Sequence, residues 1–446
     1  MTLETESLQL LTKSLETLEG GFAGLPEFST AVDLEPMAGI LNEVATRMQD
    51  NYPYAHPLYA GQMLKPPHPM ARLAYMLSMW VNPNNHALDG GKASSAMEKE
   101  AVSEIAEMFG WKEQHLGHLT SGGTMANLEA LWIADQLHPG KMVVASSQAH
   151  YTHSRITDVL KIPYQSIAVD NRARMDLDDL ELILKTQDVG TVVVTLGTTG
   201  TGSIDPLPGI LELQKRYHFR IHIDSAYGGY FKLASNLDAD GLVAYAMIDQ
   251  ADSIVIDPHK CGLQPYGCGC ILFKDASVGA IYKHDSPYTY FCSDDLHLGE
   301  ISLECSRAGA GAVALWATQQ LLPMIKGGVF AQDLEKSRSA ALKLYALLDD
   351  DPLELTVYEP QLDIVIWAPK AKTSSEISAL SQKMFDDTAK QNLHLAIMKL
   401  PKKLLEPYWP EVEFDEDTVS CLRSCLMKPE HLAWIDEIWK IYKSVR

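Results

Sequence analysis

The chain has 446 residues, 46% of them hydrophobic, so it can bury a large core and divide into two or three structural units. Its formal net charge of -21 would repel nucleic acid and anionic lipid, which excludes both as expected partners. The first residues lack a basic start and an apolar run, and no apolar stretch is long enough to span a membrane, so we expect neither a leader nor an anchor.

The N-terminal part, residues 1–70, is expected to form a helical arm. Between residues 36 and 48, apolar side chains recur at helical spacing, at Met37, Ile40, Leu41, Val44 and Met48. A proline-rich crossing follows at residues 53–69. The apolar face of such an arm must pack against another surface.

Residues 71–325 are expected to form a large α/β domain. From about residue 118, short apolar runs alternate with helical patterns, which is typical of strands buried between helices in a mostly parallel sheet. The expected strands are residues 142–145, 191–196, 220–223, 253–256 and 270–273. Residues 326–446 begin with a long helical stretch, continue with strand-like pieces at 353–358 and 362–367, and then predict helices to the end, as a small α+β domain.

The seven cysteines are scattered along the chain, which indicates reduced thiols and a cytoplasmic location. The closest pairs, Cys268 with Cys270 and Cys421 with Cys425, lie in apolar, strand-like sequence and lack the Cys-x-x-Cys spacing that zinc sites favour. We therefore expect no metal ion.

A loop of small residues, Thr120-Ser121-Gly122-Gly123-Thr124, precedes a helical segment with one apolar face. Unpaired amides at the start of that helix, the close approach that Gly123 allows and the hydroxyl of Thr124 make a natural phosphate seat. The alternative is an ordinary capped turn.

Two further polar positions follow apolar runs at the same edge of the expected sheet. Thr199, in a turn rich in threonine and glycine, can hydrogen-bond a ligand, and the alternative is a plain polar turn. His150 brings a flat ring that can stack on a cofactor, and the alternative is a structural or surface histidine. His150 and His153 lack the helical i, i+4 spacing of a zinc pair.

Asp224 and Lys260, each just after a short apolar run, carry the strongest chemical signal as a pair. Either residue alone would be an ordinary polar side chain at a strand end. A lysine amine can form a Schiff base with the aldehyde of pyridoxal 5'-phosphate, and a carboxylate beside the pyridine nitrogen keeps that nitrogen protonated. His259 can reach the cofactor phosphate or a substrate group. Asp257 would repel a phosphate unless it points away, is neutralised by a base or is separated by a water.

Together these segments resemble the motifs of the group II pyridoxal phosphate-dependent decarboxylases, the family of the glutamate, aromatic amino acid, histidine and tyrosine decarboxylases. The likeness runs from about residue 50 to the C-terminus. In family order it comprises a phosphate loop at 120–128, a ring-stacking His150, Asp224 with Ala226 beneath the ring, and the lysine motif Asp257-Pro258-His259-Lys260.

The resemblance implies an aspartate aminotransferase-like fold of type I, with a mostly parallel seven-stranded sheet, and a homodimer whose active sites lie between subunits. It also implies that Tyr59 and Arg423 contact the substrate, although Arg423 can instead brace the small domain. In this family a loop tyrosine returns the proton after carbon dioxide leaves. Tyr290 is the candidate for that role, and the alternatives are Tyr288, His297, His259 and Lys260.

The sequence departs from the family in two respects. Many members have Asn or Ser where Asp257 stands, although a tyrosine decarboxylase-like branch shares Asp-Pro-His-Lys. The chain is also shorter than many animal decarboxylases.

The expected reaction is the α-decarboxylation of an L-amino acid to its amine. The motif around Lys260 favours tyrosine or tryptophan as the substrate, with glutamate or aspartate as acidic alternatives. Two other functions compete: a carbon–carbon lyase similar to sphingosine phosphate lyase, and a non-catalytic dimeric scaffold. The expected lack of a membrane anchor argues against the lyase, and the presence of Lys260, Asp224 and His150 argues against the scaffold.

Overall fold

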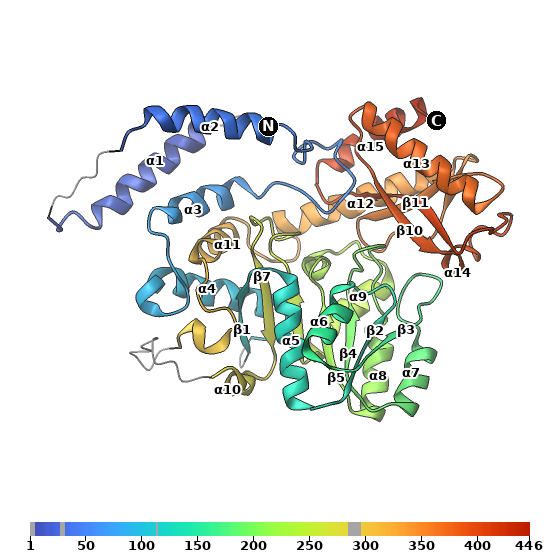
Figure 1. Ribbon diagram of the computed structural model, residues 1–446, viewed down its shortest axis with the longest axis horizontal. Helices are drawn as coiled ribbons and strands as arrows, with labels where there is room; N and C mark the ends of the chain where they lie inside the picture. The colour runs from blue at the N-terminus through green and yellow to red at the C-terminus, as the bar shows by residue number, and fades with distance from the viewer. Residues whose placement is uncertain (1–4, 27–31, 113–114, 284–295) are drawn as a thin grey trace.

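Two β-sheets organise the chain in the computed structural model, which describes residues 5–26, 32–112, 115–283 and 296–446 (Figure 1). The larger sheet has seven strands in the order β1-β7-β6-β5-β4-β2-β3. Its strands are β1 (Leu116–Thr120), β2 (Met142–Ser146), β3 (Tyr164–Ile167), β4 (Val189–Thr195), β5 (Arg220–Asp224), β6 (Ser253–Ile256) and β7 (Gly269–Phe273). All run parallel except β7, which is antiparallel to both of its neighbours.

The central strands of this sheet are buried on both faces, as their apolar sequences predict. Every residue of β4 is buried, and β6 and β7 are equally enclosed. The surrounding helices are α4 (Leu88–Phe109), α5 (Gly123–Leu137), α6 (Thr152–Leu160), α7 (Leu177–Thr186), α8 (Leu207–Tyr217), α9 (Ala239–Ala246), α10 (Gly279–Tyr282) and α11 (Gly309–Leu321). The prediction of a mostly parallel sheet between helices is confirmed, while the two edge strands, β1 and β3, were not among the expected strands.

The smaller sheet corrects the sequence-based expectation for the C-terminal part. Its four antiparallel strands lie in the order β10-β11-β9-β8. They are β8 (Glu354–Thr356), β9 (Ile364–Pro369), β10 (Ala396–Pro401) and β11 (Thr418–Cys425), accompanied by the helices α12 (Val329–Asp349), α13 (Ser374–Lys390), α14 (Lys402–Leu405) and α15 (His431–Ser444). The prediction of helices from 368 to the end was therefore wrong, because β10 and β11 complete the sheet.

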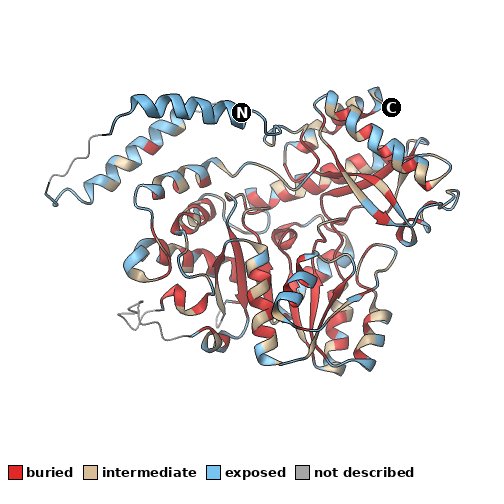
Figure 2. Cartoon of the chain, in the orientation of Figure 1, coloured by how far each residue is buried: buried red, intermediate tan, exposed pale blue. Residues whose placement is uncertain are grey.

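The N-terminal arm lies along the outside of the molecule. It contains α1 (Thr5–Gly20) and α2 (Glu35–Met48) and leads through residues 49–68 to α3 (Pro69–Met79). Figure 2 shows the strands of both sheets mostly in red, for buried residues, and α2 in pale blue. No residue of α2 is buried in the single chain, so the apolar face predicted for this helix is exposed. Among the described helices, none has an apolar stretch long enough to cross a bilayer.

Candidate active site

Most of the functional candidates surround one pocket of about 280 Å³ at the carboxyl edge of the larger sheet. The loops that follow β1, β2, β4, β5 and β6 all open at this edge, because those strands are parallel. The pocket is lined by all nine residues predicted to bind the cofactor: Gly123, Thr124, His150, Thr199, Asp224, Ala226, Asp257, His259 and Lys260. The fold therefore brings together groups spread over almost 140 positions of the sequence.

The start of α5 forms one wall of the pocket and has the features of a phosphate seat. Gly122 has a φ of +151°, a backbone conformation that favours glycine. A Cβ atom on Gly123 would lie 2.7 Å from Oδ2 of Asp257, so only glycine fits there. The first amides of α5 point out of the helix with its positive dipole end, and Thr124 adds a hydroxyl beside them.

Asp224, the last residue of β5, is held as an anion by His153. The Nε2 atom of His153 donates to Oδ2 of Asp224 at 2.8 Å, and the amide of Ala226 donates to Oδ1 at 3.1 Å. Burial alone would raise the pKa of Asp224, but the hydrogen bond and charge of His153, with the charge of Lys260, outweigh it and hold the pKa well below its usual range. Asp224 is therefore negatively charged near neutral pH.

Sequence reasoning missed this role of His153, which it weighed only as a metal ligand. His153 is fully buried in the first turn of α6, directly after the loop that follows β2. Its place in the helix that starts at the same sheet edge as Asp224 is the signal that could have found it. We expect His153 to orient Asp224 without touching a ligand.

Replacing His153 by leucine should lower the rate of cofactor-dependent turnover by about 10- to 100-fold, the usual effect of removing a residue that orients a functional group. The loss should fall on kcat rather than KM, because Asp224 serves the cofactor ring. Steady-state kinetics would measure it. His138→Leu, a change at the far end of α5, should leave both constants unchanged. A rise in KM with kcat unchanged would contradict the role.

Lys260 lies in the turn after β6, where two carboxylates surround its amine. Its Nζ atom is 3.1 Å from Oδ2 of Asp257. Burial lowers the pKa of Lys260, but the charges of Asp257 and Asp224 exceed that effect and raise it overall. The amine therefore has to lose a proton before it can attack a carbonyl group.

His150 stands at the end of the loop that follows β2 and is held in one orientation. The amide of Thr152 donates to Nδ1 of His150 at 3.3 Å, and the hydroxyl of Thr152 is in close contact with the same atom. Burial lowers the pKa of His150. The neutral, fixed ring on the wall of the pocket is suited to stack on a flat ligand, as predicted for it.

Thr199 is positioned by contacts from the small sheet. Arg423, in β11, donates from Nη2 to the carbonyl oxygen of Thr199 at 2.5 Å and from Nε to that of Gly200 at 2.8 Å. Its Nη1 atom donates to Gln62 of the arm at 3.0 Å. Arg423 does not line the pocket, so its contacts match the bracing interpretation. Its contact with substrate stays a prediction.

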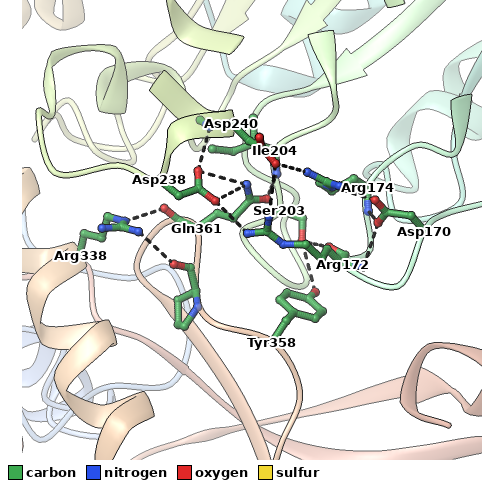
Figure 3. Close-up of polar contacts among 12 residues, drawn as sticks. Asp170, Arg172, Arg174, Ser203, Ile204, Asp238, Asp240, Arg338, Tyr358 and Gln361 are labelled. Carbon is green, nitrogen blue, oxygen red and sulfur yellow. Dashed lines mark hydrogen bonds and ion pairs between the residues drawn. The ribbon is translucent and has the colours of Figure 1, made fainter. Parts of the chain in front are cut away.

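A polar cluster surrounds Ser203 and Ile204, which follow this turn in the sequence (Figure 3). The hydroxyl groups of Ser203 and Tyr358 are 3.2 Å apart, and the amide of Ile204 donates to Gln361 at 2.9 Å. Further ion pairs link Arg172 to Asp238 at 2.8 Å. Arg423 of β11 and the loop between β8 and β9 thus both contact residues 199–204.

Tyr59 lies outside the pocket of its own chain. Its side chain is 5% exposed, and its carbonyl oxygen accepts a hydrogen bond of 2.5 Å from Lys428. Burial raises the pKa of Tyr59 to about 12, so it is a neutral phenol. Its contact with substrate therefore stays a prediction, and such a contact would need a neighbouring subunit.

The candidates for proton return are less defined. Tyr290 and Tyr288 lie outside the described residues. His297 is buried at the start of the short helix Leu298–Ile301, where its Nδ1 atom accepts from the amide of Leu88 at 3.2 Å, and it is not among the described residues that line the pocket. Of the named alternatives, His259 and Lys260 line it.

The residues present fit pyridoxal phosphate. Lys260 would bind the aldehyde of the cofactor, and Asp224 would face its pyridine nitrogen. The start of α5 would bind its phosphate. Two buried polar atoms of the lining, Oγ1 of Thr195 and Oδ1 of Asp257, have no hydrogen-bond partner among the described residues, as is expected where a polar ligand completes the site. Fold and site thus define the class of pyridoxal phosphate-dependent enzymes of fold type I.

Comparison with known proteins gives the family. The model of the pyridoxal-dependent decarboxylase conserved domain matches residues 35–368, and the chain belongs to this family. The L-tyrosine decarboxylase of Enterococcus faecium is 27% identical over 78% of this chain and 75% of its own length. A probable L-tyrosine/L-aspartate decarboxylase of Methanothermobacter thermautotrophicus is 28% identical over 71% of this chain and 85% of its own length.

A solved structure has the same fold over the whole chain. The crystal structure of mouse CSAD superposes with a TM-score of 0.79 at 19% identity, over 100% of this chain and 92% of that chain. The predicted fold type, cofactor and enzyme class are therefore confirmed, and the chain is a pyridoxal phosphate-dependent amino acid decarboxylase. Family membership favours decarboxylation over the lyase and scaffold alternatives.

Proposed function

We propose that the enzyme decarboxylates an L-amino acid with an aromatic side chain, such as tyrosine or tryptophan. The observation that carries this choice is the charge of the pocket lining. Among the described lining residues, Lys260 is the only lysine or arginine, and it serves the cofactor. An acidic side chain such as that of glutamate or aspartate would need a further cation.

The relatives support the same choice. The Enterococcus faecium protein is named for L-tyrosine, and the Methanothermobacter thermautotrophicus protein for L-tyrosine or L-aspartate. The arginine that could serve an acidic substrate, Arg423, is engaged by two backbone carbonyl groups and Gln62. An aromatic side chain needs no such partner.

The residues that carry the proposed reaction have separate tasks. Bound pyridoxal phosphate supplies an electron-withdrawing ring that accepts the electrons released with carbon dioxide. Lys260 anchors the cofactor and yields its place to the substrate amine, Asp224 holds a proton on the ring nitrogen, and His150 fixes the plane of the ring. Tyr290 is the proposed donor of the final proton, and the alternatives are Tyr288, His297, His259 and Lys260.

The test is a screen of the twenty L-amino acids for carbon dioxide release by the cofactor-loaded enzyme. Release from tyrosine or tryptophan at a rate well above that from glutamate and aspartate would support the proposal. Preference for an acidic amino acid would contradict the substrate class and leave the decarboxylase in place. Cleavage of a carbon–carbon bond without carbon dioxide release would favour the lyase.

We also propose that the enzyme is a homodimer in which α2 packs against a second copy of the chain. Apolar residues of α2 are exposed in the single chain: Met37, Ile40, Leu41, Val44 and Met48. An exposed apolar face marks an interaction site, and the second copy that the family resemblance implies would be able to cover it. Tyr59 follows α2 and would then lie near the neighbouring subunit's pocket.

Combining Ile40→Glu with Val44→Glu should break the dimer, because two carboxylates would be buried without partners. Light scattering coupled to size exclusion should give a mass near 49.4 kDa for this variant and twice that for the wild type. Leu182→Glu is a matched control, since Leu182 is 57% exposed and Ile40 61%. A wild-type protein that is monomeric at micromolar concentration would contradict the proposal.

A further inference from the structure

The carboxylate of Asp257 lies directly at the phosphate seat. A Cβ atom on Gly123 would be 2.7 Å from Oδ2 and 2.9 Å from Oδ1 of Asp257, so this side chain packs against the first residue of α5. Asp257 is 2% exposed, and its Oδ1 atom has no hydrogen-bond partner among the described residues. The amides at the start of α5 would bind the cofactor phosphate. The carboxylate of Asp257 and that phosphate would then be two neighbouring anions.

Two side chains of the same turn can balance the charge of Asp257. The Nζ atom of Lys260 is 3.1 Å from Oδ2, and the Nε2 atom of His259 is 3.5 Å from the same oxygen. The Nδ1 atom of His259 donates to the carbonyl oxygen of Cys268 at 2.9 Å, so Nε2 is the nitrogen that faces Asp257. A proton on either Oδ2 or Nε2 would form a hydrogen bond between the two side chains.

The other titratable groups around Asp257 do not supply a positive charge. They are Asp224, His150, Tyr230, Tyr266, Cys268 and Cys270. Burial raises the pKa values of the tyrosines and cysteines and lowers that of His150, so all five are neutral near pH 7. Asp224 is an anion. Among the described residues, only Lys260 and His259 can therefore offset the negative charge of Asp257.

Cofactor binding would weaken the contact between Lys260 and Asp257. On condensing with the aldehyde carbon and releasing water, the nitrogen of Lys260 would keep at most one N–H to face the carboxylate, in place of three. At the same time the phosphate adds negative charge at the start of α5. Burial lowers the pKa of His259, so the ring is neutral before the cofactor arrives and can accept a proton.

We propose that the Asp257–His259 pair takes up one proton when the phosphate ester of the cofactor binds, so that cofactor affinity falls as pH rises. The inference rests on the proposed cofactor role of this pocket. The proton lies between Oδ2 of Asp257 and Nε2 of His259, so the pair carries no net negative charge beside the phosphate. An asparagine at position 257 would need no such proton.

The experiment compares the wild type with Asp257→Asn, both freed of cofactor. Pyridoxal phosphate is titrated by calorimetry in two buffers of different ionisation enthalpy, which gives the number of protons taken up, and the Schiff-base absorbance is followed in parallel. The wild type should take up about one proton more per site than the variant, and its affinity should fall by roughly tenfold more per pH unit above pH 7. Asp158→Asn, at a side chain that is 85% exposed, controls for the loss of one charge and should match the wild type.

Equal proton numbers and equal pH slopes for wild type and Asp257→Asn would overturn the inference. The proposed function would still stand if both proteins formed the Schiff base and released carbon dioxide. If Asp257→Asn does not fold, Asp257→Ser gives the same comparison with a smaller side chain. A wild-type protein that binds no cofactor would overturn the proposed function, and the inference with it.

Discussion

Lys260→Ala should abolish the Schiff-base absorbance and lower carbon dioxide release by at least about a thousandfold, as expected when the covalent anchor of a multi-residue site is removed. The reason is geometric: Lys260 lines the pocket from the turn after β6, and it is the only described lysine that does. No other amine is therefore placed to hold the aldehyde, and the cofactor would be bound by non-covalent contacts alone.

Borohydride reduction followed by mass spectrometry measures the anchor separately from activity. Reduced wild-type protein should carry the cofactor mass on Lys260, and the variant should carry none. Lys274→Ala, at the end of β7 and outside the pocket, removes one positive charge and should behave as the wild type. Cofactor mass on another lysine of Lys260→Ala, with turnover retained, would show that the assignment of the anchor is wrong.

Asp224→Asn should lower kcat by roughly 10²- to 10³-fold, a loss typical of removing one group that stabilises developing charge. The amide keeps the shape of the side chain but not its charge, so the ring nitrogen would lose its proton and the ring would accept electrons less readily. The Schiff-base absorbance should persist, because Lys260 is intact. Loss of binding without loss of kcat would contradict this role.

The pH dependence of that deficit is also predictable. His153 and Lys260 hold the pKa of Asp224 well below its usual range, so its charge is constant across an assay range of about pH 5 to 8. The ratio of wild-type to Asp224→Asn rates should therefore not change with pH in this interval. A ratio that falls towards low pH would mean that Asp224 becomes protonated there. Asp158→Asn again serves as the charge control.

The arrangement of Asp224, Lys260 and His150 could be predicted because all three depend on local sequence. Each follows an apolar run, and parallel strands bring their carboxyl ends to one edge of a sheet. The contacts of Arg423 could not be predicted, because they depend on how the small sheet sits against the turn at 199–200. Sequence patterns describe single elements, whereas this contact joins residues more than 220 positions apart.

The strand that carries Arg423 was recognised only locally. The sequence around Cys421 and Cys425 in β11 is strand-like, but the C-terminal part as a whole was assigned to helices, because no partner strand for this segment could be identified from the sequence. The strand forms because its backbone hydrogen-bonds to β9 and β10, and the sequence of β11 alone does not show these partners. Tertiary pairing thus decided an element that local propensity left open.

The brace from Arg423 to the carbonyl groups of Thr199 and Gly200 also concerns the order in which the protein is made. Every described residue of the pocket lining has been synthesised once position 260 is added, but Arg423 follows on the order of ten seconds or more later. A nascent chain would therefore display the anchor lysine before the turn at Thr199 is secured. Firm capture of the cofactor is expected only after translation is nearly complete, when the last strand of the small sheet pairs.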